Sequence, residues 1–143
     1  HVNPVMNLFF GSEGFLFGEN PWDDLGQVYR LTGKPIMITE YSFRAVVPDG
    51  PPSDRPPGYL TLETQQQRAD YYSHYMNALY DRAYVVGAHW FEHCDQPATG
   101  RGGDGENNNF GTVDVRDNVY VELTNAMQAM NHAVRIREGQ QRH

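Results

Sequence analysis

Apolar side chains recur at helical spacing in three stretches of this 143-residue chain. In the first stretch, 20–33, Leu25, Val28 and Leu31 lie three residues apart. The other two stretches repeat in steps of three and four residues, which aligns their apolar side chains on one face of a helix. They consist of Ala69, Tyr72, Met76, Leu79 and Ala83, and of Tyr120, Leu123, Met127, Met130 and Val134. The pattern predicts helices over 20–33, 62–82 and 120–134, followed by a polar tail, 135–143, that frays.

Residues that commonly begin and end helices support these boundaries. Asn20 is a good N-cap, Pro21 fits the first helical position, and Gly33 is a natural C-terminal stop. Thr61 can cap the second helix, with Glu63 in its first turn.

Two short apolar runs interrupt the helices and predict β-strands. They span 35–40 and 84–91, and each gives way to polar residues, the first at Glu40 and the second at Glu92. An earlier run, Val5 to Phe10, is a possible further strand.

Long loops follow both strands. Residues 44–60 contain five prolines and no regular pattern, and Gly100 to Asn109 is rich in Gly, Asn and Asp. A short extended piece, 111–115, comes after the second loop. Strands that alternate with helices predict βα units and a parallel sheet, hence one α/β domain. In (β/α)8 barrels, the loops that follow the strands build the active site.

Composition and charge narrow the possible partners. The net charge is −7 and Lys34 is the only lysine, which argues against nucleic acid as a partner because its binding depends on Lys and Arg at phosphates. The aromatic content of 13% argues against disorder. No apolar run reaches the length of about 18 residues that a membrane span needs, so we expect no membrane partner. The single cysteine, Cys94, excludes an intrachain disulfide and a Cys-based zinc site, but it leaves the compartment open.

Glu40 and Trp90 occupy equivalent places, because each lies at the carboxyl end of a predicted strand. In adjacent parallel strands the two side chains would lie near one another on the same edge. A carboxylate beside a large aromatic ring suits carbohydrate chemistry, since sugars stack their C–H faces on rings and pair their hydroxyls with acids and amides. Further hydrogen-bonding groups follow in the sequence: His89, Glu92, His93, Asp95, Gln96, Arg101, Asp104, Glu106 and Asn107.

Several features have other interpretations. Glu40 could be a strand-end acid that merely faces solvent. His89, His93 and Asp95 could bind a metal only if the chain bends after Phe91, because residues four apart on a strand lie about 13 Å apart. The acidic loop 104–109 offers oxygen ligands for Ca²⁺, but it lacks EF-hand spacing and is more typical of a turn held by Asn and Asp. Tyrosines of the second helix, at positions 71, 72 and 75, could bind sugar, although packing onto the sheet is the commoner role.

Two motifs resemble one enzyme family. Gly33-Lys-Pro-Ile-Met-Ile-Thr-Glu-Tyr-Ser-Phe43 resembles the seventh strand of clan A glycoside hydrolases, retaining (β/α)8-barrel enzymes that include agarases, β-galactosidases and mannanases. Gly87-Ala-His-Trp-Phe91, followed by Asp95-Gln-Pro97, Gly100-Arg101 and Asp104-Gly-Glu-Asn107, resembles their eighth strand and its loop, most closely in agarase-like enzymes. The resemblance covers about 20–134. It implies that the chain is the C-terminal part of a (β/α)8 barrel.

The resemblance also implies roles for individual residues. Glu40 matches the catalytic nucleophile, and Trp90 matches the aromatic floor of the sugar subsite. The other expected substrate contacts are His89, Glu92, Asp95, Gln96 and Arg101. No cofactor and no metal are implied. A second carboxylic acid, about 5–5.5 Å from the nucleophile, would act as acid and base.

That second acid belongs to the fourth strand of the family, which these residues do not contain. A full barrel needs at least about 200 residues, and neither Glu92 nor Glu106 matches the motif of the missing acid. We therefore expect the C-terminal portion of a glycoside hydrolase that cleaves β-linked agarose or another galactan, with a carbohydrate substrate. A partner chain or a homo-oligomer could complete the barrel. The alternatives are a non-catalytic carbohydrate-binding module and a structural remnant that assembles with a partner.

Overall fold

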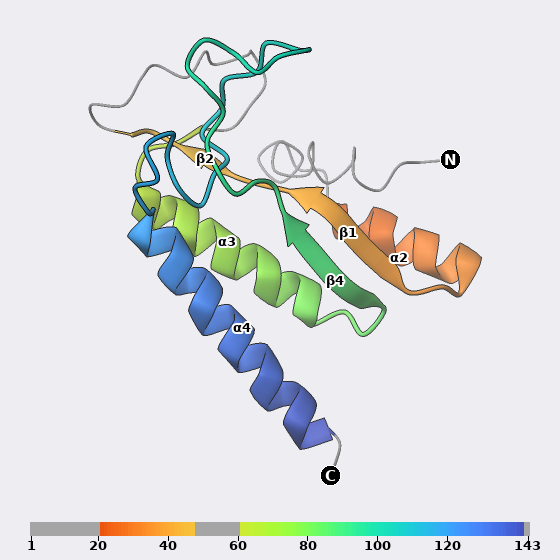
Figure 1. Ribbon diagram of the computed structural model, residues 1–143. Helices are drawn as coiled ribbons and strands as arrows, with labels where there is room; N and C mark the ends of the chain where they lie inside the picture. Colours follow the sequence, from red (N-terminus) through yellow and green to blue (C-terminus); the bar gives the residue numbers. More distant parts are fainter. Residues whose placement is uncertain (1–20, 48–60, 142–143) are drawn as a thin grey trace.

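A computed structural model describes residues 21–47 and 61–141, with side chains described for 23–47 and 61–134. The elements in chain order are α2 (Pro21–Thr32), β1 (Ile36–Tyr41), β2 (Arg44–Ala45), β3 (Thr61–Leu62), α3 (Gln65–Tyr80), β4 (Val85–Trp90) and α4 (Val121–Gln141). Figure 1 shows these elements along the chain. The predicted class, a mixed α/β fold with parallel strands, is confirmed for this part of the chain.

β1 and β4 lie side by side and run parallel, as the sequence predicted. Ile36 pairs with Val85 and Tyr41 pairs with Trp90, with register shifts after Ile36 and between Ile38 and Tyr41. The Phe91 amide donates to the Tyr41 carbonyl at 2.8 Å, which continues the pairing past the end of β4. The carboxyl ends of both strands therefore meet at one edge, which we call the rim.

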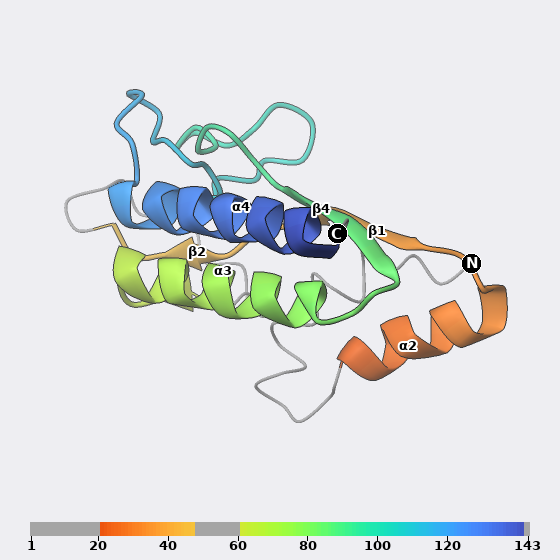
Figure 2. The ribbon, with the colours of Figure 1, turned by 90° about the horizontal axis from the view of Figure 1, so that it is seen from below.

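Helices cover one face of this two-stranded sheet. α3 and α4 run side by side beneath it (Figure 2). Ile36, Ile38 and Tyr41 are buried between sheet and helices. They form one core with Leu25, Tyr72, Met76, Leu79, Tyr120, Leu123 and Met130. Apolar positions from all three predicted helices thus meet in the same core, but the prediction was wrong for Leu31, which is 79% exposed at the end of α2.

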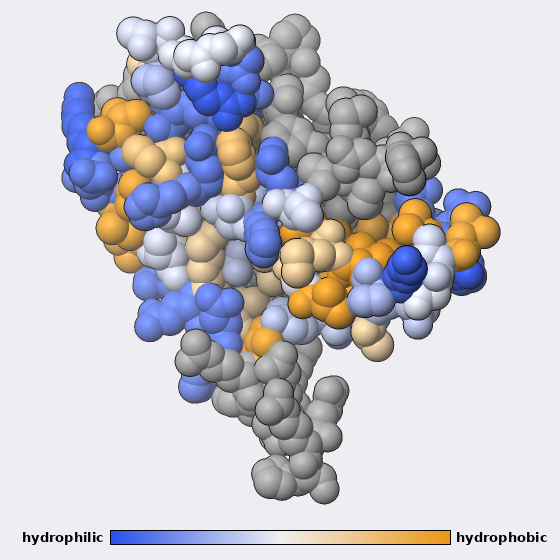
Figure 3. Space-filling model, turned by 45° about the vertical axis from the view of Figure 1, so that its right-hand side comes forward, coloured by the Kyte–Doolittle hydropathy of each residue, from blue (hydrophilic) through white to orange (hydrophobic). Residues whose placement is uncertain are grey.

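Among the described residues, no helix covers the other face of the sheet. Met37 of β1 is 45% exposed and Val86 of β4 is 60% exposed, whereas their neighbours along each strand turn toward the helices. Strand side chains alternate between faces, so these residues mark the side opposite α3 and α4. Figure 3 shows apolar atoms at the surface of this side of the molecule. We call it the open face.

Two predictions near the first loop were wrong. The first two residues of the predicted loop 44–60 form the strand β2, which pairs in parallel with β3 just after the loop, Arg44 with Thr61. Thr61 therefore does not cap α3. Thr64 is the N-cap instead, and its hydroxyl accepts from the Gln67 amide at 3.1 Å. Pairing with β2 keeps Thr61 extended, and the helix begins only after the chain leaves that pair.

The ends of the other helices agree with the sequence in one case and differ in another. Gly33 ends α2 with a φ of 63°, and its amide donates to the Tyr29 carbonyl at 2.8 Å, as expected for a glycine stop. The tail expected to fray from Arg135 is helical in its backbone to Gln141. It contains no proline, so α4 continues without an interruption. The possible strand at 5–10 and the N-cap at Asn20 lie outside the described residues.

No helix in the described part of the chain combines the length and apolar character that crossing a bilayer requires.

Candidate functional site

Glu40 lies on β1 one residue before the pair that ends the sheet at the rim. It is half-buried, while the next residue, Tyr41, is buried. The Tyr41 hydroxyl donates to the sulfur of Met76 on α3 at 3.0 Å, so that ring points to the helices. The register shift between Ile38 and Tyr41 leaves both of these residues buried, so Thr39 and Glu40 between them are directed away from the helices, toward the open face.

Trp90 is the last residue of β4, and its ring lies between the core and the rim. Its ring centroid lies 5.3 Å from that of Tyr41, 5.8 Å from that of Tyr72 and 6.2 Å from that of Phe43. Its indole N–H donates to the Phe110 carbonyl at 2.9 Å. The ring is half-buried, held on one side by this aromatic cluster. Trp90 is therefore a fixed platform rather than a mobile side chain.

Phe91 is an aromatic residue at the rim that the sequence analysis did not single out. It is half-buried, and its ring centroid lies 6.0 Å from that of Phe110. The guanidinium of Arg101 lies 5.8 Å from its ring. The sequence could have indicated Phe91 as a second rim aromatic, because alternation along the strand directs Phe91 and Trp90 to opposite sides.

His89 and Glu92 flank the two rings. His89 is exposed, and strand alternation directs it to the open face, the side of Glu40. Glu92 is half-buried, and its backbone amide donates to the Phe110 carbonyl at 3.2 Å. Its Oε1 atom is shielded from solvent and has no hydrogen-bond partner among the described residues. Buried acceptors normally have a hydrogen-bond partner, so this oxygen is available to accept a hydrogen bond from a ligand at the rim.

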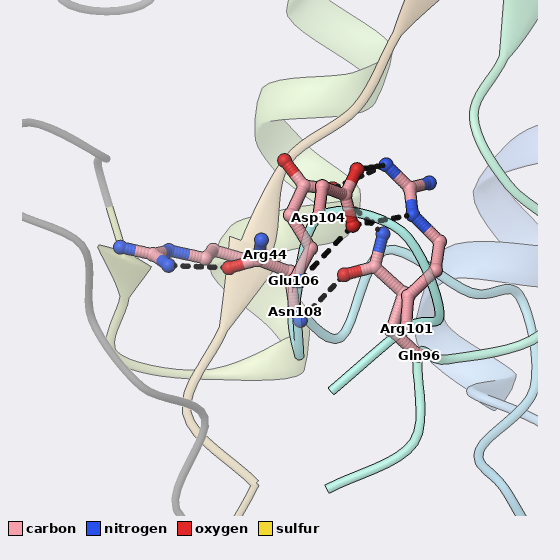
Figure 4. Close-up of polar contacts among 6 residues, drawn as sticks. All are labelled: Arg44, Gln96, Arg101, Asp104, Glu106 and Asn108. Atoms are coloured by element: carbon pink, nitrogen blue, oxygen red, sulfur yellow. Dashed lines mark hydrogen bonds and ion pairs between the residues drawn. The ribbon is translucent and has the colours of Figure 1, made fainter. Parts of the chain in front are cut away.

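A chain of buried polar groups holds the loop after β4 against β2 (Figure 4). Gln96 is 5% exposed, and both ends of its amide are used by the protein. Its nitrogen donates to Glu106 at 3.0 Å, and its oxygen accepts from the Asn108 amide at 2.8 Å. The Asn108 side chain in turn accepts from Arg44 at 2.6 Å. This network links two segments 64 residues apart in sequence.

Arg101 closes the outer end of the same network. Its guanidinium donates to both carboxylate oxygens of Asp104, through Nε at 3.0 Å and through Nη2. The same Nη2 atom also pairs with Glu106 at 3.0 Å. Hydrogen bonds from Arg101 lower the pKa of Asp104 to about 2. The charge of Arg101 is therefore matched by two acids of its own loop.

Asp95 fastens the segment that leads into α4. Its two carboxylate oxygens accept from the Gly111 amide at 2.8 Å and from the Tyr120 hydroxyl at 2.5 Å. Burial raises the pKa of Asp95, and these two hydrogen bonds oppose that shift. The geometry gives Asp95 a clear task in holding the loop.

The metal interpretation finds no support in the geometry. His93 is exposed, and its Nδ1 lies 3.2 Å from the Thr112 hydroxyl rather than beside a second ligand. Across the described residues, no group of three His, Cys, Asp or Glu side chains is placed to hold a metal ion. In the loop 104–109, Asp104 and Glu106 are engaged by Arg101, which is typical of an internally bonded turn.

Comparison with known sequences gives two beta-agarases. No family model matches the chain. Beta-agarase B of Vibrio sp. (strain JT0107) is 47% identical over 77 residues, which cover 54% of this chain and 8% of that protein. Beta-agarase A of the same organism is 36% identical over 109 residues, which cover 76% of this chain and 10% of that protein. The chain thus spans about a tenth of the length of these curated relatives.

Comparison with solved structures agrees. The structure of PfGH50B matches 82% of this chain and 15% of its own length, with 38% identity and a TM-score of 0.66. The structure of an exo-beta-agarase matches 77% of this chain and 15% of its own length, with 35% identity and a TM-score of 0.65. Over part of its length, this chain is therefore homologous to beta-agarases and similar to them in fold.

Proposed function

We propose that this chain is the C-terminal part of a retaining clan A glycoside hydrolase that cleaves β-glycosidic bonds of agarose or another galactan. In this proposal β1 and β4 are the last two strands of a (β/α)8 barrel. The observation that carries it is the parallel pairing of β1 with β4, which brings Glu40 and Trp90 to one rim beside a long polar loop. The similarity to beta-agarases supports the same substrate class.

Glu40 is the nucleophile in this proposal. Its carboxylate attacks the anomeric carbon and forms a covalent glycosyl ester, while the bond from that carbon to the leaving oxygen breaks. A second carboxylic acid, supplied from the fourth strand outside this chain, gives its proton to the leaving oxygen. The same group then takes a proton from water, which attacks the anomeric carbon and releases Glu40.

The remaining rim residues divide into two groups by how the protein already uses them. His89 is exposed, Glu92 keeps an oxygen that no described residue bonds, and Trp90 keeps part of its ring accessible, so these three are proposed to contact the sugar. Arg101 is partly exposed but is already paired with Asp104 and Glu106, so a sugar contact would have to share its guanidinium with them. Both ends of the Gln96 amide and both oxygens of Asp95 are occupied by the protein. We assign those two side chains to holding the loop rather than to direct substrate contact.

The substitution Glu40→Gln tests the nucleophile in the polypeptide that carries this segment together with the fourth strand. Turnover of agarose oligosaccharides should fall by at least about a thousandfold, because an amide cannot form the glycosyl ester. Binding of the same oligosaccharides, measured by calorimetry, should remain within about threefold, since the two side chains have the same shape.

Glu63→Gln is the matched control, because Glu63 is exposed and lies just before α3. It should leave both turnover and binding at the parent level. Turnover that survives in Glu40→Gln would refute the nucleophile assignment. Equal loss of turnover and binding would count against it as well, because it would indicate a structural or binding role.

A further inference from the structure

Arg68 on α3 is a fully buried charged residue that the site described above does not yet use. Its side chain is 0% exposed, and it stands within the apolar stripe of its helix, between the sheet and the segment leading into α4. No ion pair joins it to a carboxylate among the described residues. A buried cation is costly unless it is fully hydrogen-bonded, so its surroundings decide its role.

The guanidinium is satisfied by backbone carbonyls and by one amide. Nε donates to the Phe43 carbonyl at 2.7 Å, and Nη2 donates to the Gly111 carbonyl at 2.9 Å. Nη1 donates to the side chain of Gln65 at 3.2 Å. Together, these three bonds require the flat, forked shape of a guanidinium, which a lysine ammonium does not reproduce.

Two aromatic rings complete the environment of Arg68. Its guanidinium carbon lies 5.4 Å from the ring centroid of Trp90 and 5.2 Å from that of Tyr120. Cation–π contacts at this range are favourable, and more so away from water. Burial lowers the pKa of Arg68 to about 10, and the charge of Asp95 opposes that shift. The side chain therefore stays charged at neutral pH.

Apart from the bond to Gln65 of its own helix, the contacts of Arg68 share a pattern, because each reaches a segment that leaves the rim. Phe43 lies three residues after Glu40, Trp90 ends β4, and Gly111 and Tyr120 belong to the segment between the long loop and α4. One rigid group thus ties the exit of β1 to the exit of β4.

We propose that Arg68 is a positioning residue, whose guanidinium holds the Trp90 ring and the turn after Glu40 at a fixed spacing. The proposal rests on the function proposed for the rim, since the spacing matters only if Glu40 and Trp90 act on one sugar. Arg68 itself lies behind the Trp90 ring and acts through its neighbours. A geometric role also explains why the residue is an arginine rather than an apolar side chain of similar volume.

The indole N–H of Trp90 reports this spacing directly, because it donates to the Phe110 carbonyl. The chain has two tryptophans, so Trp22→Phe leaves Trp90 as the only indole in the NMR spectrum. In that background we would compare Arg68→Met, which removes the charge and the fork, with Arg68→Lys, which keeps the charge alone. Hydrogen exchange of the indole N–H should accelerate by at least about tenfold in Arg68→Met and by an intermediate factor in Arg68→Lys.

Arg82→Met is the matched control. Arg82 follows the same helix at its far end, and its guanidinium bonds the Ala78 carbonyl within that helix. In Arg82→Met, hydrogen exchange of the Trp90 indole N–H should match that of the parent. The proposal would be overturned if the Arg68→Met or Arg68→Lys chain is folded and the exchange rate of its Trp90 indole N–H stays within about twofold of this control.

A measurement on the parent chain covers the case in which the variants do not fold. The Arg68 Nε–H should give a resolved, slowly exchanging resonance with nuclear Overhauser contacts to the Trp90 ring protons. Absence of those contacts in the folded parent would also overturn the proposal.

These readouts do not depend on turnover, so they separate this inference from the proposed function. Turnover that survives Glu40→Gln refutes the nucleophile whatever the indole shows. In the polypeptide with the complete site, Arg68→Lys should lower kcat by at least about tenfold with KM within about threefold, as expected when alignment is lost. An unchanged kcat would refute the positioning role even if the indole contacts are present.

Discussion

The two faces of the β1–β4 sheet differ in what covers them. On the helix face, Ile38 is fully buried against side chains of α3 and α4. On the open face, Met37 and Val86 remain exposed although they belong to the same strands. The helix face is built by local periodicity within this chain. Glu40 and His89, by contrast, are directed to the open face, so the proposed chemistry lies on the side that no described helix covers.

The largest expected effect comes from the helix face. Ile38→Ala should lower the free energy of unfolding by about 2–5 kcal/mol, because it leaves a cavity in a fully packed position. Met37→Ala, one residue away on the open face, should cost less than about 1 kcal/mol, since that side chain is 45% exposed. Urea denaturation of both variants measures the contrast. Similar costs for the two would show that the faces are equally packed.

A smaller, pH-dependent effect is expected at the rim. Asp95→Asn should cost about 1–3 kcal/mol, because an amide has one acceptor oxygen, so either the Gly111 amide or the Tyr120 hydroxyl can no longer donate to this side chain. Burial raises the pKa of Asp95, so its folded form holds a proton more tightly than the unfolded form. The stability that this proton contributes is present below about pH 4 and is lost as the pH rises through the folded pKa.

The asparagine variant does not titrate at this position. The stability of the parent relative to Asp95→Asn should therefore decline from pH 4 upward and then level off, as followed by urea denaturation at each pH. For the control Asp23→Asn, at an exposed position of α2, the difference in free energy of unfolding from the parent should not change with pH. A difference that grows with pH would mean that the carboxylate is stabilised by its surroundings rather than destabilised by burial.

The smallest expected effect on stability belongs to the open face. Val86→Ser should change the free energy of unfolding by less than about 0.5 kcal/mol, because the side chain is 60% exposed. It should nevertheless weaken self-association, measured by sedimentation velocity, since exposed apolar patches favour association. Val121→Ser, at a comparably exposed apolar position on α4, serves as the control. Equal effects of the two substitutions would show that association does not depend on the open face.

The elements with many periodic positions could be predicted from the sequence. Leu123 and Met130 repeat along α4, and Ile36 and Ile38 mark β1, so both the elements and their buried sides follow from spacing. The parallel neighbours β1 and β4 followed from the alternation of strands with helices. The (β/α)8 barrel that the family resemblance implied stays a prediction.

Short or long-range features could not be predicted in this way. β2 and β3 have two residues each, too few for any period, and their pairing placed the cap of α3 at Thr64 rather than Thr61. The bond between Arg44 and Asn108 depends on how a distant loop folds back. The role of Arg68 could not be predicted for a different reason. The sequence shows one charged residue in an apolar stripe, but it does not show which groups this residue bonds.

The short β2–β3 pair also has a consequence for how this fold can vary. Arg44 and Ala45 lie beside Thr61 and Leu62, so the two ends of the intervening segment are held at neighbouring points. For a flexible loop, doubling its length costs only about 0.6 kcal/mol of closure entropy when its ends are held together. Insertions or deletions between these two strands would therefore leave Glu40 and α3 in place. The pair makes this segment a place where evolution or an engineer can change the surroundings of the rim without rebuilding it.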